Sequence, residues 1–180
     1  MVTLHGKNVY LATLEREHCR TIFQDFEYDF EAKTEMLHIG HSVERADNWY
    51  TEIQELQDNK HIRLGIFLHN GTVIGDVALQ DMDNKNRSCS LGYGLTKLAY
   101  YGKGYMTESV NLMLDYAFNN VGIERVFAHT SEQNIGSQRV LEKCGFTPEG
   151  RERKAEYFGG KRYDRLMYGL LSDEYFYKHA

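Results

Sequence analysis

The sequence predicts an α/β (α+β) fold, in which helices flank both faces of one mixed, mostly antiparallel β-sheet of about six to seven strands. Two patterns and one absence lead to this prediction. Apolar residues alternate with period two in the middle of the chain, strand-like and helix-like segments alternate in the second half, and no linker or internal repeat divides the 180 residues. A chain of this length buries roughly 70% of the surface that its unfolded form exposes. We therefore expect a single domain over residues 1–180.

The N-terminal part of the chain is expected to start with a strand and a helix. Apolar alternation over residues 9–14 predicts the strand, and apolar residues on one side of residues 15–24 predict the helix. The following segment, residues 25–31, alternates acidic with aromatic residues and fits either a bent helix or a strand. A second helix is expected over residues 43–57, where Trp49, Ile53 and Leu56 recur at helical spacing.

Period-two alternation predicts an antiparallel meander in the middle of the chain. Strands are expected over residues 61–68, 73–79 and 88–95. The dipeptide Asn70-Gly71 lies between the first two, and Asn-Gly between such runs is the strongest short-range signal for a hairpin. These three strands are therefore expected to be neighbours in the sheet.

The second half alternates helices with strands. Helices are expected over residues 103–119 and 134–143, and strands over residues 125–130, 147–157 and 163–171. Both helices carry residues at i, i+3, i+4 and i+7 that form one face for a sheet. A meander followed by this alternation implies a mixed sheet with helices packed on it.

The charge pattern argues against a nucleic-acid partner. The formal net charge is -5, and the Lys and Arg residues form no long run. Residues 1–11 lack a basic segment followed by an apolar run, and no stretch of about 18 consecutive apolar residues occurs. The sequence therefore predicts a cytoplasmic protein without a membrane partner.

The cysteines and histidines give no sign of a disulfide frame or a metal site. Cys19, Cys89 and Cys144 are widely spaced and include no C-x-x-C pair, which is typical of reduced thiols, and at least two are expected in the core. His38 and His41 lie close together, but no carboxylate stands at a ligand-like spacing from them. We expect no metal ion.

The turn Gly102-Lys103-Gly104 is the first candidate site. A strand that delivers a glycine turn to a helix N-terminus presents unpaired backbone N–H groups and the positive end of the helix dipole. This arrangement binds anions such as phosphate, and Lys103 adds a positive charge. A Rossmann fingerprint would need a third glycine where Thr107 stands, and a P-loop would need Ser or Thr where Gly104 stands. Glycines at helix starts also serve sterically, so the turn alone leaves both interpretations open.

A second candidate site lies about thirty residues downstream, at the start of the next helix. Asn134 is expected at the helix start, Ser137 in the first turn and Gly145 after the last. Taken singly, an Asn N-cap and a glycine after a helix are routine structural features.

Together, the two segments resemble the GNAT superfamily of acetyltransferases, specifically the RimJ/RimL-like branch of ribosomal-protein N-acetyltransferases. The residues that carry the resemblance are Gly92-Tyr93, Gly-Lys-Gly-Tyr-x-Thr-Glu over 102–108, Asn-x-x-Ser over 134–137, Leu-Glu-Lys-x-Gly-Phe over 141–146, Glu-Gly-Arg over 149–151, Gly160 and Asp164. The resemblance covers most of the chain. It implies a GNAT fold and acetyl-CoA as cosubstrate.

The resemblance also implies which residues bind acetyl-CoA. In such enzymes a splayed strand binds the pantetheine arm through its backbone, the glycine turn binds the pyrophosphate, and the helix-start asparagine binds near the thioester. The corresponding residues here are Tyr93, Gly94 and Leu95 for the strand, Tyr101, Gly102, Lys103, Gly104, Tyr105 and Met106 for the turn, and Asn134 with Ser137 for the helix start.

The resemblance leaves one catalytic residue and no general base. Many GNAT enzymes use a tyrosine as the acid for the thiolate, but Leu141 stands there, and RimL-like members are thought to use the serine that corresponds to Ser137. We expect Ser137 to donate a hydrogen bond to the thiolate, although a serine in this position also bonds the local backbone. Many relatives carry Glu where Ser90 stands. The proton could then pass through water to the backbone or to another acid such as Asp76 or Glu132.

The acceptor is expected to be a primary amine, and a protein N-terminal α-amine is favoured because its pKa, near 8, is lower than that of an alkyl ammonium. A small amine such as a polyamine or aminoglycoside is the alternative, since Asp25, Glu27, Asp29, Glu31 and Glu35 form an acidic run that would attract a polycation. A non-catalytic acyl-CoA-binding module is a third reading. The resemblance also makes a homodimer plausible.

Overall fold

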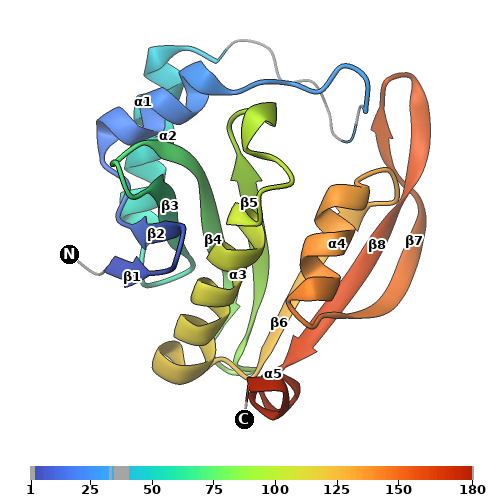
Figure 1. Ribbon diagram of the computed structural model, residues 1–180. Helices are drawn as coiled ribbons and strands as arrows, with labels where there is room; N and C mark the ends of the chain where they lie inside the picture. Colours follow the sequence, from blue (N-terminus) through green and yellow to red (C-terminus); the bar gives the residue numbers. More distant parts are fainter. Residues whose placement is uncertain (1–2, 33, 35–40, 180) are drawn as a thin grey trace.

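A computed structural model describes residues 3–32, 34 and 41–179 of the chain (Figure 1). The described residues form an eight-stranded sheet in the order β1-β2-β3-β4-β5-β6-β8-β7. The strands are β1 (Thr3–His5), β2 (Val9–Ala12), β3 (Ile62–Leu68), β4 (Val73–Asp83), β5 (Ser88–Leu95), β6 (Arg125–Ser131), β7 (Thr147–Phe158) and β8 (Lys161–Leu171). The α-helices are α1 (Arg16–Asp25), α2 (Val43–Leu56), α3 (Tyr105–Tyr116), α4 (Ile135–Lys143) and α5 (Ser172–His179).

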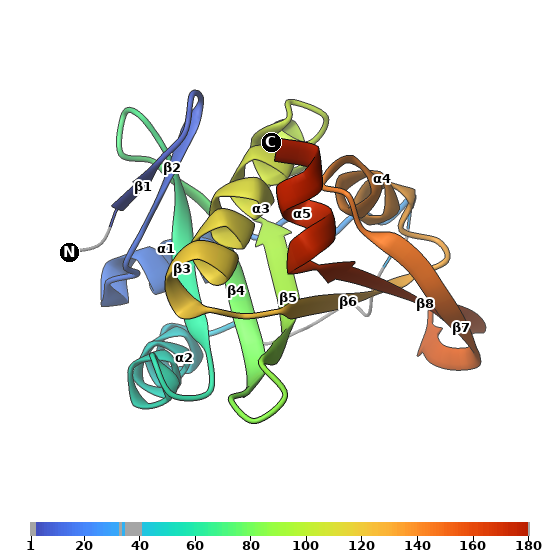
Figure 2. The same cartoon turned by 90° about the horizontal axis from the view of Figure 1, so that it is seen from below.

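Helices cover both faces of the sheet, as the sequence predicts. Figure 2 shows α3, α4 and α5 on one face and α1 with α2 on the other. The α3 face is sealed by residues at i, i+3, i+4 and i+7, namely Val110, Met113, Leu114 and Ala117, all fully buried. A smaller apolar cluster between the sheet and the α1–α2 pair includes Cys19, Ile53 and Phe67. The mixed α+β fold is thereby confirmed.

The ladder between β5 and β6 is parallel and stops early. All other neighbours in the sheet pair antiparallel, and β4 follows β5 as far as Leu95. In contrast, β6 pairs with β5 only at Ser88, Cys89 and Ser90. Beyond Ser90 the two strands diverge, although β6 stays paired with β8 to Ser131. The sheet is therefore split next to the second half of β5 (Figure 1).

Most of the predicted elements are present, with four corrections. The sheet gains an eighth strand, β1, and the chain gains the C-terminal helix α5, neither of which was predicted. Residues 26–29 are irregular and residues 30–32 form a turn, so the acidic segment is neither a helix nor a strand, apart from Asp25, which ends α1. Helix α3 starts at Tyr105 rather than 103, because Gly104 adopts a left-handed conformation with φ 82°. Glu35 and His38 lie outside the described residues.

Two further expectations from the sequence, one about the cysteines and one about membrane-spanning helices, can be compared with the structure. Cys19, Cys89 and Cys144 are free and buried, and burial raises the pKa of each thiol to about 12. Across the described ranges, no helix is both long and apolar enough to cross a membrane.

Candidate active site

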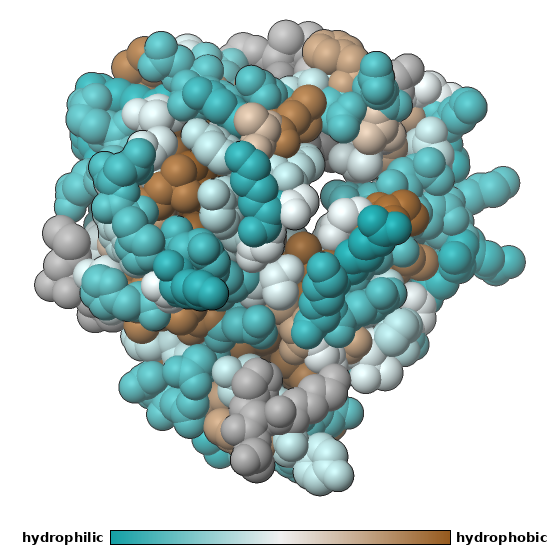
Figure 3. Space-filling model, in the orientation of Figure 1, coloured by the Kyte–Doolittle hydropathy of each residue, from teal (hydrophilic) through white to brown (hydrophobic). Residues whose placement is uncertain are grey.

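The split between β5 and β6 opens into a cavity of about 440 Å³. Figure 3 shows the surface hollowed between the α3 and α4 sides, with apolar residues in its depth and hydrophilic ones around it. The lining comes from β5, β6, the start of α4, the end of β7 and one loop residue. These residues are Leu91, Gly92, Tyr93, His129, Thr130, Ser131, Asn134, Ser137, Glu156, Tyr157, Phe158 and Thr34.

The cavity passes from one face of the sheet to the other. Side chains alternate along a strand, so Tyr93 shares a face with the buried Cys89 and Leu91, under α3 and α4. On β6 the buried Ala128 and Thr130 face the same way. His129 therefore points to the opposite face, which none of the described helices covers beside β6 (Figure 2).

One backbone edge of β5 has no partner strand in the cavity. In an antiparallel pair alternate residues direct their N–H and C=O groups toward the partner. The N–H of Thr96 donates to the carbonyl of Ile74 on the β4 side, so by alternation Tyr93 and Leu95 direct their groups toward β6. Since β6 has left the ladder by this point, these groups are available to a ligand.

The glycine turn lies outside this cavity, at the N-terminus of α3. Gly102 and Gly104 have φ values of 72° and 82°, and nothing lies within 4 Å of the position that a Cβ would take on either. The first bond of the helix runs from the N–H of Glu108 to the carbonyl of Gly104. In the part of the chain that the structure describes, no backbone carbonyl accepts from the N–H of Gly102, Lys103 or Gly104.

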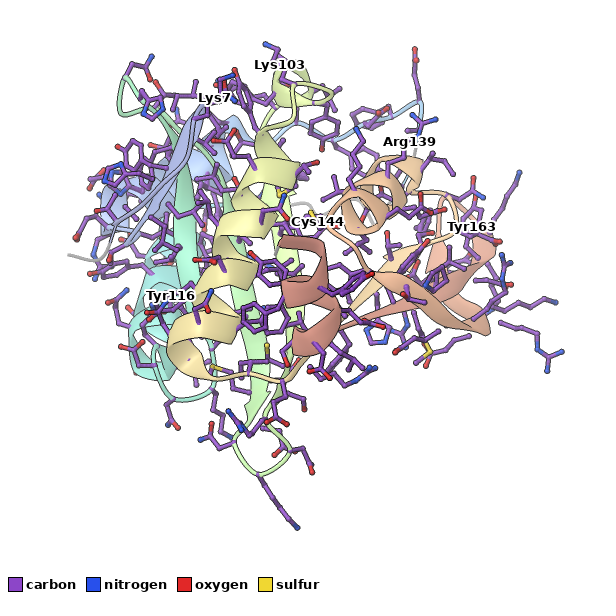
Figure 4. The ribbon with its side chains drawn as sticks, turned by 60° about the horizontal axis from the view of Figure 1, so that its bottom comes forward. Lys7, Lys103, Tyr116, Arg139, Cys144 and Tyr163 are labelled. Atoms are coloured by element: carbon purple, nitrogen blue, oxygen red, sulfur yellow. The ribbon has the colours of Figure 1, made fainter. Side chains whose placement is uncertain are left out.

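A second lysine approaches the same end of α3. Lys7, in the turn between β1 and β2, shares a surface hollow with Gly104, and Figure 4 shows Lys7 and Lys103 at the N-terminal end of the helix. Glu108 holds this turn, because its carboxylate accepts from the backbone N–H and the side-chain amide of Asn8, both at 2.8 Å. Backbone N–H groups and two ammonium groups at one helix end are the features that favour anion binding. Sequence reasoning missed Lys7, since nothing local links it to residue 104.

Asn134 and Ser137 lie together at the start of α4. The Oδ1 of Asn134 accepts from the N–H of Ser137 at 2.9 Å, so Asn134 is the N-cap of the helix. Its side-chain NH2 donates to none of the described residues, and Asn134 is one of the residues that line the cavity. The capping role expected of any asparagine here therefore leaves half of the amide for a ligand.

The hydroxyl of Ser137 bonds to a tyrosine instead of its own helix. Its Oγ lies 2.9 Å from the Oη of Tyr93, with either hydroxyl able to donate, and the same Oη lies 3.3 Å from the backbone carbonyl of Ser137 as an alternative acceptor of the phenol proton. Burial raises the pKa of Tyr93 to about 12, although the Ser137 hydrogen bond opposes this, so the phenol stays protonated near neutral pH. Leu141 is fully buried in the core, so the phenol beside Ser137 comes from β5 and not from α4.

The two carboxylates expected as bases are engaged elsewhere. Asp76 forms a buried ion pair with Arg63, and burial raises its pKa. Glu132 accepts from Arg151 at 2.9 Å and from the N–H of Asp164 at 2.9 Å, which fixes the β7–β8 hairpin. Neither side chain lines the cavity. Both remain hypotheses that this geometry disfavours.

A different carboxylate stands beside Ser90. The hydroxyl of Ser90 donates to Asp81 at 2.8 Å, across the bulge where the β4–β5 register shifts. Asp81 has a φ of 50° and lines a separate hollow under α2 rather than the split. It lies near the position where relatives carry Glu, but not in the same cavity.

The acidic run is largely used to fix the loop after α1. Asp25 forms an ion pair with Lys97 at 2.9 Å, and Glu27 accepts from the N–H of Leu98 at 2.9 Å. Asp29 accepts from the N–H groups of Glu31 and Ala32. These contacts hold the loop over the end of β5, where Thr34 joins the cavity wall. Among the described carboxylates of this run, Asp25 has a cationic partner, and Glu27 and Asp29 accept from backbone N–H groups.

A split mixed sheet beside a glycine turn at a helix N-terminus defines the class of acyltransferases that use coenzyme A thioesters. The chain belongs to the acetyltransferase (GNAT) domain family, whose model matches residues 8–147. It is 34% identical over 178 residues to YjcK of Bacillus subtilis, a probable N-acetyltransferase, covering 95% of this chain and 98% of the relative. The resemblance stated from the motifs is thus confirmed at the level of the family.

Other relatives differ in the acceptor that their names give. YdaF of Bacillus subtilis, a putative ribosomal N-acetyltransferase, is 31% identical over 122 residues, covering 68% of this chain and 66% of YdaF. The spermidine N(1)-acetyltransferase of Vibrio cholerae is 26% identical over 132 residues, covering 70% of this chain and 75% of the relative.

Solved structures share the whole fold. The ribosomal-protein-S5-alanine acetyltransferase from Vibrio fischeri superposes with a TM-score of 0.85 at 22% identity, covering 97% of this chain and 99% of that one. Spermidine N-acetyltransferase from Vibrio cholerae gives 0.82 at 22% identity, with 95% and 99% covered. At such identities the similarity establishes the fold. The protein is an N-acetyltransferase of the GNAT family that uses acetyl-CoA.

Proposed function

We propose that the protein transfers the acetyl group of acetyl-CoA to the N-terminal α-amine of a protein, as ribosomal-protein N-acetyltransferases do. The observation that carries this choice of acceptor is the use of the acidic run inside the protein. Asp25, Glu27 and Asp29 serve an ion pair, a backbone bond and a turn. A polycation needs several free carboxylates, whereas one α-amine needs none.

We assign acetyl-CoA, the acetyl donor, to the cavity between β5 and β6 and to the glycine turn before α3. The pyrophosphate fits the N–H groups of Gly102, Lys103 and Gly104, because both glycines leave open space and Lys7 and Lys103 supply positive charge. Tyr101, Tyr105 and Met106 complete the segment expected to hold it. The pantetheine amides suit the unpaired edge of β5 at Tyr93, Gly94 and Leu95, and the free side-chain NH2 of Asn134 lies where this arm would end.

Ser137 is proposed as the residue that stabilises the departing thiolate. It lines the cavity, and its hydroxyl is held by Tyr93 at 2.9 Å rather than by the backbone of α4. A donor fixed in place before the reaction stabilises the charge that develops in the transition state. In this assignment Tyr93 is a positioning residue for Ser137.

A small amine is the second candidate, because the relative from Vibrio cholerae is named as a spermidine acetyltransferase and Glu156 lines the cavity. One carboxylate in the cavity suits one ammonium group. It does not provide the row of charges that an extended polyamine would use.

Thiol release from acetyl-CoA distinguishes these acceptors. The panel consists of peptides with free N-termini, the same peptides with blocked α-amines, polyamines and aminoglycosides. We expect turnover with free N-termini, loss of turnover on blocking, and a mass shift on the first residue. Faster turnover with polyamines would assign the small-amine function. Tight acetyl-CoA binding without turnover on any acceptor would leave a non-catalytic acyl-CoA-binding module.

A further inference from the structure

We propose that His129 is the general base that removes the proton from the acceptor amine. This inference rests on acetyl transfer at the cavity between β5 and β6, as proposed above. His129 was absent from the expected site residues, and its type suits the task because imidazole is the side chain whose ordinary pKa lies closest to neutral pH.

The position of His129 in the split is the first argument. Phe127 is the last residue of β6 that pairs with β5, and His129 is the next residue on the same face of the strand. Its side chain is exposed and lines the cavity with Gly92. The ring of Phe127 packs edge-on against the imidazole of His129, with 5.8 Å between the two ring centroids. Hence the imidazole stands where the cavity first opens.

The two faces of the sheet separate the two proton-handling groups. Ser137 and Tyr93 lie on the α4 face, whereas His129 lies on the opposite face. The amine adds to the thioester carbon from one face of the planar acyl group, and the sulfur then leaves that carbon with a negative charge. The reaction therefore uses one group that takes the amine proton and another that stabilises the thiolate, and the cavity offers His129 for the first and Ser137 for the second.

Competing carboxylates are held away from the cavity. Asp76 is paired with Arg63, Glu132 with Arg151, and Asp81 lines a different hollow. Within the described residues, Glu156 on β7 is the carboxylate that also lines the cavity. It is the direct rival to His129.

Two ion pairs lie on the strands around His129. On β8, Arg165 forms an ion pair with Glu152 of β7 at 2.5 Å, and on β6 Arg125 pairs with Glu149. The pKa of Glu152 is lowered, first by Arg165 and to a smaller extent by the charge of His129.

The proton balance is complete with these residues. As the amine nitrogen bonds to the thioester carbonyl carbon, an imidazole nitrogen of His129 takes one N–H proton. The C–S bond breaks, its electron pair stays on sulfur, and the Ser137 hydroxyl donates a hydrogen bond to the thiolate. The imidazolium then releases its proton to solvent through the exposed side of the cavity.

The proposal is tested by measuring the pre-steady-state and steady-state turnover of His129→Gln. The acceptor in these measurements is the one that the wild-type protein uses fastest. General bases contribute about 10²- to 10⁴-fold, so we expect turnover at pH 7 to fall about 10²-fold while the Kd for acetyl-CoA is unchanged. The acid limb of the wild-type pH profile should disappear, leaving the dependence set by the ionisation of the amine. Repeating the profile with two acceptors whose amines differ in pKa separates the acid limb from the dependence that the amine sets. In His129→Ala, added imidazole should restore part of the turnover.

Matched variants define the outcomes that overturn the proposal. His5→Gln, on β1 at the far edge of the sheet, should retain wild-type turnover. Unchanged turnover and pH profile in His129→Gln would remove the role, as would a joint loss of acetyl-CoA affinity. Loss of the acid limb in Glu156→Gln or Asp81→Asn instead would transfer it to that carboxylate. Absence of transfer by the wild-type protein with every acceptor would overturn the proposed function itself, and this inference with it.

Discussion

The proposed donor side and the proposed acceptor side of this enzyme are built from different parts of the chain. On the donor side, the glycine turn and the free edge of β5 offer backbone groups within one continuous stretch, residues 91–106. On the acceptor side, β6, β7 and the loop at Thr34 contribute side chains that are far apart in the sequence. A site made of backbone leaves a local motif, because glycine and turn residues specify it. A site made of side chains depends on strand pairing.

The largest expected effect comes from Ser137→Ala. Removing a donor that stabilises a developing charge costs about 10²-fold in turnover, and the N-cap bond from the Ser137 N–H to Asn134 survives the change. We expect turnover to fall by this factor while calorimetry gives an unchanged Kd for acetyl-CoA. Ser172→Ala, at the start of α5, is the control. Unaltered turnover would exclude Ser137 from the reaction. The two sides of the site would then differ only in what they bind.

Gly104→Ala should act on the donor side through the backbone. The φ of 82° costs an L-residue about 1 kcal/mol, and the new Cβ projects into open space where the pyrophosphate is proposed to bind. We expect the Kd for acetyl-CoA to rise about tenfold, which corresponds to about 1.4 kcal/mol.

Gly71→Ala provides the matched control for that variant. Gly71 has a φ of 86° and equally open surroundings, but it lies in the β3–β4 turn. We expect Gly71→Ala to lose as much thermal stability as Gly104→Ala but to leave the Kd for acetyl-CoA unchanged. Equal Kd values for both variants would contradict the assignment of the turn to the pyrophosphate.

Tyr93→Phe tests whether the phenol positions Ser137. The change removes one hydrogen bond, worth about 1 kcal/mol, and leaves the ring in the core. We expect a modest fall in turnover, about fivefold by the same bond energy, with unchanged acetyl-CoA affinity. Because the pKa of Tyr93 is about 12, the pH profile below pH 10 should not change. Tyr10→Phe, stacked on Phe67 at the other end of the sheet, should retain full turnover. A changed pH profile below pH 10 would instead make Tyr93 a titrating group.

The smallest effect is expected at Glu108, which holds Lys7 beside the turn. Burial raises the pKa of this carboxyl, but the bonds from Asn8 and Val9 outweigh burial and lower it. A lowered folded-state pKa means that the stabilisation is present above the unfolded pKa of 4.5 and is lost as pH falls through the folded one. Glu108→Gln should therefore cost about 1 kcal/mol in urea unfolding at pH 7. The difference from wild type should shrink in acid, and a constant difference would assign the effect to shape alone.

The sequence was sufficient for elements with strong local patterns. The Asn70-Gly71 hairpin, the strands on either side of it and the apolar face of α3 follow from period and turn chemistry. The three-residue strand β1 is too short to show a period, and its pairing with β2 is set only by the fold. The segment after α1 alternates as a strand would, yet its acids bond Lys97 and the N–H of Leu98 and hold it as an irregular loop.

The candidate site was predictable to the same extent. Gly102, Gly104 and Asn134 stand in motifs, and the structure agrees with the local conformations inferred for them. The contact between Tyr93 and Ser137 spans 44 residues and follows only from where β5 lies against α4. His129 sits in an alternating strand like any other, and only the early end of the β5–β6 ladder turns it toward an opening.

That short ladder also leaves a narrow seam in the middle of the sheet. Three residue pairs join the β1–β5 half to the β6–β8 half, whereas the other long strands pair over most of their length. A small rotation about Ser88–Ser90 would widen or narrow the cavity without breaking another ladder. The backbone amides of Leu91 to Leu95 that face the split should exchange with deuterium faster than those facing β4, and slow down when a ligand fills the gap. Exchange of the β5 amides that face the split would thus report whether the site is occupied, and exchange of those that face β4 would report whether the sheet is intact.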